Sequence, residues 1–161
     1  MRVLTKVGDI FSVKINNDEK KYFQLIAFDL TELNSDVIRS FKQIYSINDI
    51  PKLSEIVTGE IEFYTHCVTK AGVKLGLWEK VGNYKDIGDL DIFFRRSGDY
   101  GNYQKKISEN WYIYKINQMS IKVGKLPDIY RNTEIGGVNP PYLVFHRIRT
   151  GELGFSYPDF E

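Results

Sequence analysis

Histidine and cysteine, from which metal sites and nucleophilic centres are most often built, are scarce in this chain: 161 residues contain two histidines and one cysteine. His66 and His146 stand far apart, so the H-x-x-x-H spacing of a metal-binding helix is absent. Cys67 follows His66 directly in an expected strand, where neighbouring side chains point to opposite faces. Cys67 is therefore predicted to be a buried apolar residue. We predict no catalytic, metal-binding or cofactor-binding residues.

Carboxylates occur in pairs two residues apart, which places both members of a pair on one face of a strand. Glu60 with Glu62, and Asp89 with Asp91, are such pairs. Paired acids can hydrolyse glycosides or bind a hard cation, so a metal- or carboxylate-dependent hydrolase is one alternative function. Alternating polar residues are also how a one-sided sheet meets water, and this is the interpretation that we favour.

The glycines do not form a phosphate-binding loop, because no G-x-G-x-x-G or P-loop pattern occurs. Gly136-Gly137 precede an expected helix whose start carries Pro140 and Pro141. Proline lacks the amide hydrogen that would bind a phosphate at a helix start. We therefore expect no nucleotide cofactor.

A basic and aromatic cluster suggests a second alternative. Arg95-Arg96 and Lys105-Lys106 surround Tyr100 and Tyr103. Basic residues among aromatic rings can bind single-stranded nucleic acid by stacking. The net charge from Arg95 to Lys106 is 4 − 1 = +3, which is too small to make nucleic acid the expected partner.

An acidic cluster lies in the preceding part of the chain. Between residues 49 and 62, Asp49, Glu55, Glu60 and Glu62 accompany a single base, Lys52. Such a cluster could face a basic protein, and a nuclease would be one. As a rule, however, a charged run is solvated surface.

The aromatic residues predict the fold: 10 Phe, 11 Tyr and 2 Trp favour pleated, half-buried surfaces. Strands are predicted over residues 7–15, 21–28, 60–69, 74–81, 90–95, 111–116 and 121–124. The strand over 74–81 is expected to pair with its predecessor. Residues 35–46 fit either a strand or a helix, and we favour the strand. Short helices are predicted over 52–57, and from Asn139-Pro140, with Asn139 as cap, to Gly151.

These elements predict a mainly β (α+β) fold, either a single twisted antiparallel sheet or a partly open barrel. One or two short helices accompany the strands, the clearest near the C-terminus. A length of 161 residues fits one domain, expected to span 1–161.

Charge and hydropathy indicate the compartment. The net charge of +1 argues against general electrostatic binding to nucleic acid or acidic membranes. The N-terminus lacks the apolar segment of a secretory signal, and no apolar run approaches the ~18–20 residues of a membrane span. With a single cysteine, these features predict a cytoplasmic protein of undetermined oligomeric state.

Five segments together resemble a known family. They are Gly8-Asp9-Ile10-Phe11-Ser12-Val13, Lys21-Tyr22-Phe23-Gln24-Leu25-Ile26, Leu33-Asn34-Ser35-Asp36-Val37-Ile38-Arg39, Gly76-Leu77-Trp78-Glu79-Lys80-Val81-Gly82 and Glu109-Asn110-Trp111-Tyr112. The chain resembles the bacterial immunity protein 26 family, particularly a longer subgroup, and the core similarity covers about the first half of the chain. The resemblance implies a predominantly β fold and a protein that neutralises a toxin encoded beside it, often a nuclease. It carries over no catalytic motif.

A toxin partner would be bound by steric occlusion, without catalysis. The expected anchors are exposed aromatic residues, for which Trp78, Tyr100 and Tyr103 are the candidates. The acids Glu55, Glu60 and Glu62 would supply electrostatic steering.

Overall fold

Ten strands form two sheets between residues 2 and 160, the part of the chain that the computed structural model describes. The larger sheet has six strands in this range: β1 (Asp9–Lys14), β2 (Glu19–Asp29), β3 (Ser35–Phe41), β4 (Tyr45–Ser46), β5 (Ile61–Cys67) and β6 (Glu79–Asn83). Their order is β5-β3-β2-β1-β6, with β4 also paired to β2, and the pairings are antiparallel.

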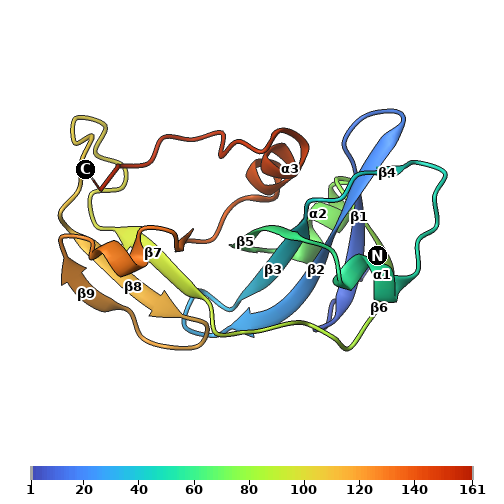
Figure 1. The fold of residues 1–161 in the computed structure, drawn as a ribbon, viewed down its shortest axis with the longest axis horizontal. Coiled ribbons are helices and arrows are strands. Elements are labelled where there is room, and N and C mark those ends of the chain that lie inside the picture. The colour runs from blue at the N-terminus through green and yellow to red at the C-terminus, as the bar shows by residue number, and fades with distance from the viewer. Residues whose placement is uncertain (1, 161) are drawn as a thin grey trace.

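The smaller sheet has four strands in the described range, in the order β10 (Glu134–Ile135), β7 (Phe93–Ser97), β8 (Trp111–Lys115) and β9 (Ile121–Gly124). The short β10 runs parallel to β7, and the other pairings are antiparallel. Figure 1 shows the two sheets toward opposite ends of the molecule. Neither closes into a barrel over these residues. The predicted mainly β fold is confirmed, and the structure adds that its strands are divided between two sheets.

The helices are short: α1 (Leu53–Val57), α2 (Thr69–Lys74), the 3-10 helix η1 (Asp128–Tyr130) and α3 (Pro141–Thr150). Gly151 ends α3 with a φ of 79°, the left-handed conformation that glycine adopts without strain. The predicted cap is wrong, because Pro140 takes that position and the Asn139 amide instead donates to Thr65 Oγ1 at 2.8 Å. None of the helices over the described residues is long and apolar enough to cross a membrane.

Residues 69–83 differ from the prediction. Residues 69–74 form α2, and the expected strand over 74–81 is replaced by the later strand β6, which pairs with β1 and not with β5. The reason is the packing of Trp78: a Cβ placed on Gly72 would lie 2.0 Å from Cζ2 of the Trp78 ring. Glycine thus lets the helix backbone approach the indole closely.

The predicted preference for a strand in the ambiguous segment 35–46 is confirmed. β3 spans Ser35–Phe41 and lies between β2 and β5, with every residue buried. A strand with neighbours on both sides satisfies its backbone hydrogen bonds and buries both faces, which suits its β-branched and aromatic residues.

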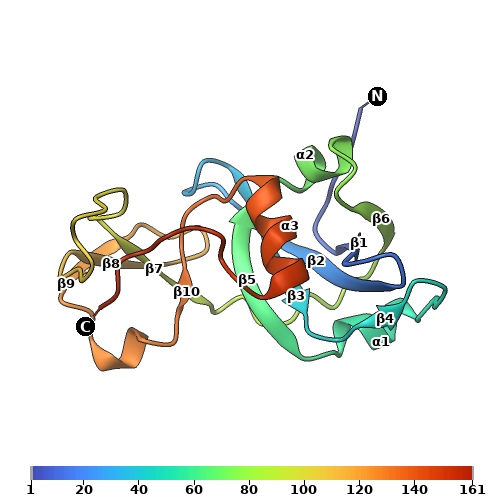
Figure 2. The ribbon, with the colours of Figure 1, turned by 90° about the horizontal axis from the view of Figure 1, so that it is seen from above.

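The main apolar core lies between the six-stranded sheet and α3. Phe11, Phe23 and Ile38 from the sheet pack with Val144 and Ile148 of α3, and Figure 2 shows α3 lying across this sheet. Burial of these side chains explains why a helix of ten residues is stable here, since isolated helices of this length are marginal in water.

A second cluster joins the two sheets. Ile26 and Val37 of the larger sheet pack with Phe94 and Tyr114 of the smaller one. The expectation that residues 1–161 form one domain stays a prediction, and this shared cluster is the feature on which it depends.

Candidate functional site

The most concentrated buried polar group lies where the two sheets meet. His66 Nε2 is 2.9 Å from Asp29 Oδ2, and both side chains are fully buried. β5 supplies the histidine and the end of β2 supplies the aspartate. The rings of Phe94 and Tyr114, from the smaller sheet, have centroids 4.5 and 5.9 Å from that of His66. This pair therefore belongs to the junction and is closed to solvent.

Asp29 also holds a turn of the smaller sheet. Its Oδ1 accepts the backbone N–H of Thr31 at 3.1 Å, the Thr31 hydroxyl at 2.7 Å and the backbone N–H of Asn117 at 3.0 Å. Asn117 follows β8, so one carboxylate connects β2, β5 and the turn between β8 and β9. Asp29 could not be predicted from the sequence, because a single acid at the end of an apolar strand is a weak signal.

The electrostatics of the pair favour a neutral imidazole beside a charged carboxylate. Burial lowers the pKa of His66 and outweighs the opposite influence of Asp29. Burial raises the pKa of Asp29, but hydrogen bonds from His66, Thr31 and Asn117 more than compensate, so its pKa lies below the usual value. A neutral His66 donates from Nε2, and its Nδ1 has no hydrogen-bond partner among residues 2–160. The arrangement orders the junction and offers no route to a substrate.

His66, Cys67 and His146 lie apart. Cys67 points into the core of Phe23 and Phe63, whereas His66 lies against the smaller sheet. Burial raises the pKa of the Cys67 thiol well above its usual value, which disfavours the reactive thiolate. His146 is on α3. Within residues 2–160, no group of three His, Cys, Asp or Glu side chains is placed to hold a metal ion.

The expected exposure of Trp78 is wrong. The side chain is 4% exposed, its ring packs edge-on against Phe23 at 5.0 Å, and its Nε1–H donates to the Thr69 carbonyl at 2.9 Å. The strand prediction for 74–81 placed the indole on a pleated surface, but α2 covers it. In this conformation Trp78 cannot offer its ring to a partner.

Two of the three predicted steering acids have lysine partners. Glu60 lies 2.7 Å from Lys42, and Glu62 lies 3.0 Å from Lys21. Glu55 is exposed on α1. The pairing reduces the field that this cluster presents to solvent, so its steering role stays a prediction.

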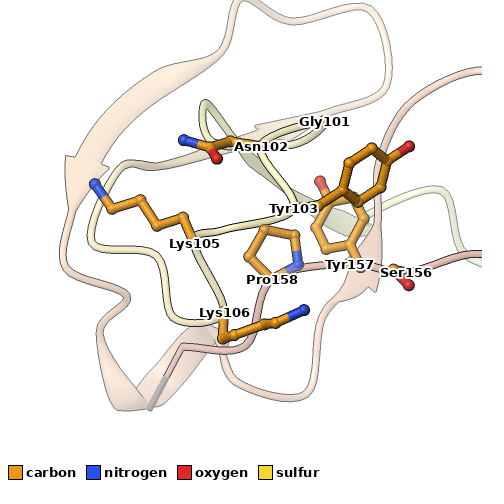
Figure 3. A pocket seen from close by; sticks show the side chains of 8 residues that line it. All are labelled: Gly101, Asn102, Tyr103, Lys105, Lys106, Ser156, Tyr157 and Pro158. Atoms are coloured by element: carbon orange, nitrogen blue, oxygen red, sulfur yellow. The ribbon is translucent and has the colours of Figure 1, made fainter.

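Tyr100 and Tyr103 are exposed, as expected, on the loop between β7 and β8. The Tyr100 ring stacks on Tyr157 of the C-terminal segment with centroids 5.1 Å apart. Figure 3 shows the loop against residues 156–158, with Lys106 extending beneath Pro158, around a cavity of about 50 Å³. The loop that carries these tyrosines lies toward the opposite end of the molecule from α1 (Figure 1).

Both arginines of the basic cluster bind other groups of the protein. Arg95 donates to the carbonyls of Arg131 and Thr133, and Arg96 forms an ion pair with Glu32 at 3.3 Å. Of the two lysines, Lys105 lies 3.7 Å from Asp99, so the expected basic surface around the loop tyrosines is smaller than predicted.

The prediction that Asp89 and Asp91 share one face of a strand is wrong. Asp91 forms an ion pair with Lys115, and Asp89 accepts the Asp91 backbone N–H at 2.8 Å. Both residues precede β7 instead of lying on a strand. The arrangement is that of a capped turn.

Comparison with protein families gives a match over residues 6–106 to the model described as immunity protein 26. This range contains the whole six-stranded sheet, α1, α2 and β7. Neither the curated proteins nor the solved structures yield a match to the chain.

Proposed function

The chain belongs to the immunity protein 26 family, and from this premise we propose that it binds a cognate bacterial toxin and neutralises it by covering its active site or substrate groove. The observation that carries the proposal is the family match over residues 6–106. In this mechanism the protein acts by the shape and chemistry of its surface and catalyses no reaction.

The proposal requires an exposed surface of sufficient size. A stable complex buries about 800 Å² on each partner, with a few aromatic or arginine residues near its centre. Of the residues predicted from the sequence, Tyr100 and Tyr103 remain candidates because they are exposed. Trp78 does not, because it is buried.

Co-expression tests the proposal. Cells that produce the toxin encoded beside this gene should grow when this protein is also made, and should stop growing without it. An unrelated toxin of the same enzymatic class is the control, and this protein should give no protection against it. Equal growth inhibition by the cognate toxin with and without this protein would refute the proposed function.

A titration separates occlusion from catalysis. Adding the purified protein to a fixed amount of toxin should lower toxin activity linearly, with complete inhibition near one equivalent. An enzyme that modifies or degrades the toxin would inactivate it at far smaller amounts. Complete inactivation at a small fraction of one equivalent would therefore contradict the occlusion mechanism.

A further inference from the structure

Two turns, one from each sheet, are joined where the sheets meet. One turn connects β2 to β3, and the other connects β8 to β9 (Figure 1). The Asn117 side chain accepts the Leu30 backbone N–H at 2.7 Å and donates to the Phe28 carbonyl at 3.0 Å. The Asn117 backbone N–H also donates to Asp29 Oδ1 at 3.0 Å, and the Thr31 hydroxyl oxygen lies 3.3 Å from the Gln118 carbonyl oxygen while its proton is donated to Asp29. These bonds hold the two turns in one fixed arrangement.

The joined turns carry a group of exposed apolar side chains, which we call the two-turn surface. It consists of Leu30 (71% exposed), Leu33 (85%), Met119 (82%) and Ile121 (63%). Together these side chains expose on the order of several hundred Å², and exposed apolar area of this size is often functional. Methionine is common on such surfaces because its flexible thioether adapts to a partner.

Leu33 is unusual in its backbone as well as its exposure. The turn from Glu32 to Ser35 is closed by the Ser35 N–H, which donates to the Glu32 carbonyl at 3.1 Å. Its central residues, Leu33 and Asn34, have φ values of 57° and 52°. Both positions favour Asn, Asp or Gly, as in a type I′ turn, and a leucine there is strained. The turn itself would be more stable with asparagine or glycine at this position, so we attribute the leucine to a role of its exposed side chain.

The shape of the two-turn surface indicates the kind of partner. Side chains that are mostly exposed project from the molecule, so only a partner that surrounds them can bury them. A cavity of about 150 Å³ opens beside Met119, and its other lining residues are mostly polar, among them Glu32 and Arg96. A second copy that presented the same projecting side chains could not surround them, which disfavours self-association through this surface.

We infer that the two-turn surface is the centre of the toxin interface and inserts into an apolar concave site of the toxin. This inference rests on the proposed function and adds to it the contact surface and the chemistry of the partner. A patch of several hundred Å² would supply much of the roughly 800 Å² that each partner buries in a standard interface.

The test measures toxin binding by Leu33→Asn. The probe is the toxin encoded beside this gene, purified as the complex, separated in denaturant and refolded, with affinity measured by calorimetry. Leu33→Asn should bind at least tenfold more weakly than the wild type, the loss expected for a central contact. Its melting temperature should be unchanged or higher, because asparagine suits the positive φ. Weaker binding by a more stable protein cannot be explained by unfolding.

Matched variants locate the contact. Ile129, 80% exposed on η1, is outside the two-turn surface, so Ile129→Asn should bind as the wild type does. If the wild type binds the toxin tightly and Leu33→Asn binds it with the same affinity, the inference is wrong and the proposed function still stands. A large loss of toxin affinity in Tyr103→Ala alone would also overturn the inference, because it would assign the interface to the loop tyrosines.

Two further outcomes are decisive. If the wild type does not bind the toxin at all, the proposed function fails, and the inference fails with it. If the wild type alone sediments as a dimer that Leu33→Asn converts to a monomer, the occupant of the two-turn surface is a second copy of this chain. That result would overturn the assignment to the toxin.

Discussion

Replacing Asp29 with alanine should lower the free energy of unfolding by about 3–5 kcal/mol, because several hydrogen bonds to one charged acceptor are lost together and each such bond contributes about 1.5–3 kcal/mol before water replaces part of it. The carboxylate accepts four hydrogen bonds, from His66 Nε2, the Thr31 N–H and hydroxyl, and the Asn117 N–H. A buried donor left without a partner costs about 1–3 kcal/mol. Thr31 and Asn117 are exposed residues, so water can replace part of the loss there, whereas His66 is fully buried.

Urea unfolding followed by tryptophan fluorescence measures this change. A loss of this size is a large part of the about 5–15 kcal/mol that stabilises a typical domain, so Asp29→Asn is measured as well. The amide keeps the volume and one acceptor oxygen but removes the charge, and we expect a loss of about 1–3 kcal/mol. Asp91→Ala is the control, since the carboxylate of Asp91 is exposed and its ion pair with Lys115 should contribute no more than about 1 kcal/mol.

A small effect of Asp29→Ala would show that Asp29 does not stabilise the junction. If Asp29→Ala lowered the free energy of unfolding by less than about 1 kcal/mol, or by no more than Asp91→Ala, the four hydrogen bonds would not stabilise the contact between the sheets. The pair of Asp29 and His66 would then be an incidental contact.

Three other predictions follow from the core. The pKa of His66 is lowered by burial, so the unfolded chain binds a proton near pH 6.5 that the folded chain binds only at lower pH. The free energy of unfolding should therefore decrease as the pH is lowered below about 6.5, by at most about 1.4 kcal/mol per pH unit. His66→Phe should lack this component in urea unfolding between about pH 7.5 and 5.5, and an unchanged slope would contradict the assignment. Gly72→Ala should lose about 1–3 kcal/mol in the same assay, because the added methyl overlaps the Trp78 ring; unchanged stability would show that the ring can move away. If residues 1–161 are one domain, variants that keep only Trp78 or only Trp111, one in the core of each sheet, should each give coincident fluorescence and circular-dichroism transitions, and separate transitions would indicate two folding units.

Much of the fold could be predicted from local patterns. The strands β2, β5 and β8 follow runs of β-branched and aromatic residues, and α3 ends at the predicted glycine. The prediction failed over residues 69–83, where apolar residues alone do not distinguish a strand from a short helix followed by a buried indole. The contact between Gly72 and Trp78 decided between them.

The candidate site was less predictable than the fold. Trp78 was predicted to be an exposed anchor because large aromatic residues are common at interfaces, but such residues are common in cores too. It did not choose Leu33, because an isolated leucine in a polar turn carries no periodic signal. The significance of Leu33 appears only with its positive φ and its exposure.

By itself the sequence determined the elements whose causes are local: the strands with alternating or aromatic residues, the position of Gly151 at the end of α3, and the family to which residues 6–106 belong. Only the tertiary structure decided which side chains meet. It divided the strands between two sheets, placed Asp29 against His66 and joined the turns that carry Leu30 and Met119. The physical reason is the range of the interactions: backbone preferences act between near neighbours in the chain, whereas burial and hydrogen bonding act between residues that only folding brings together.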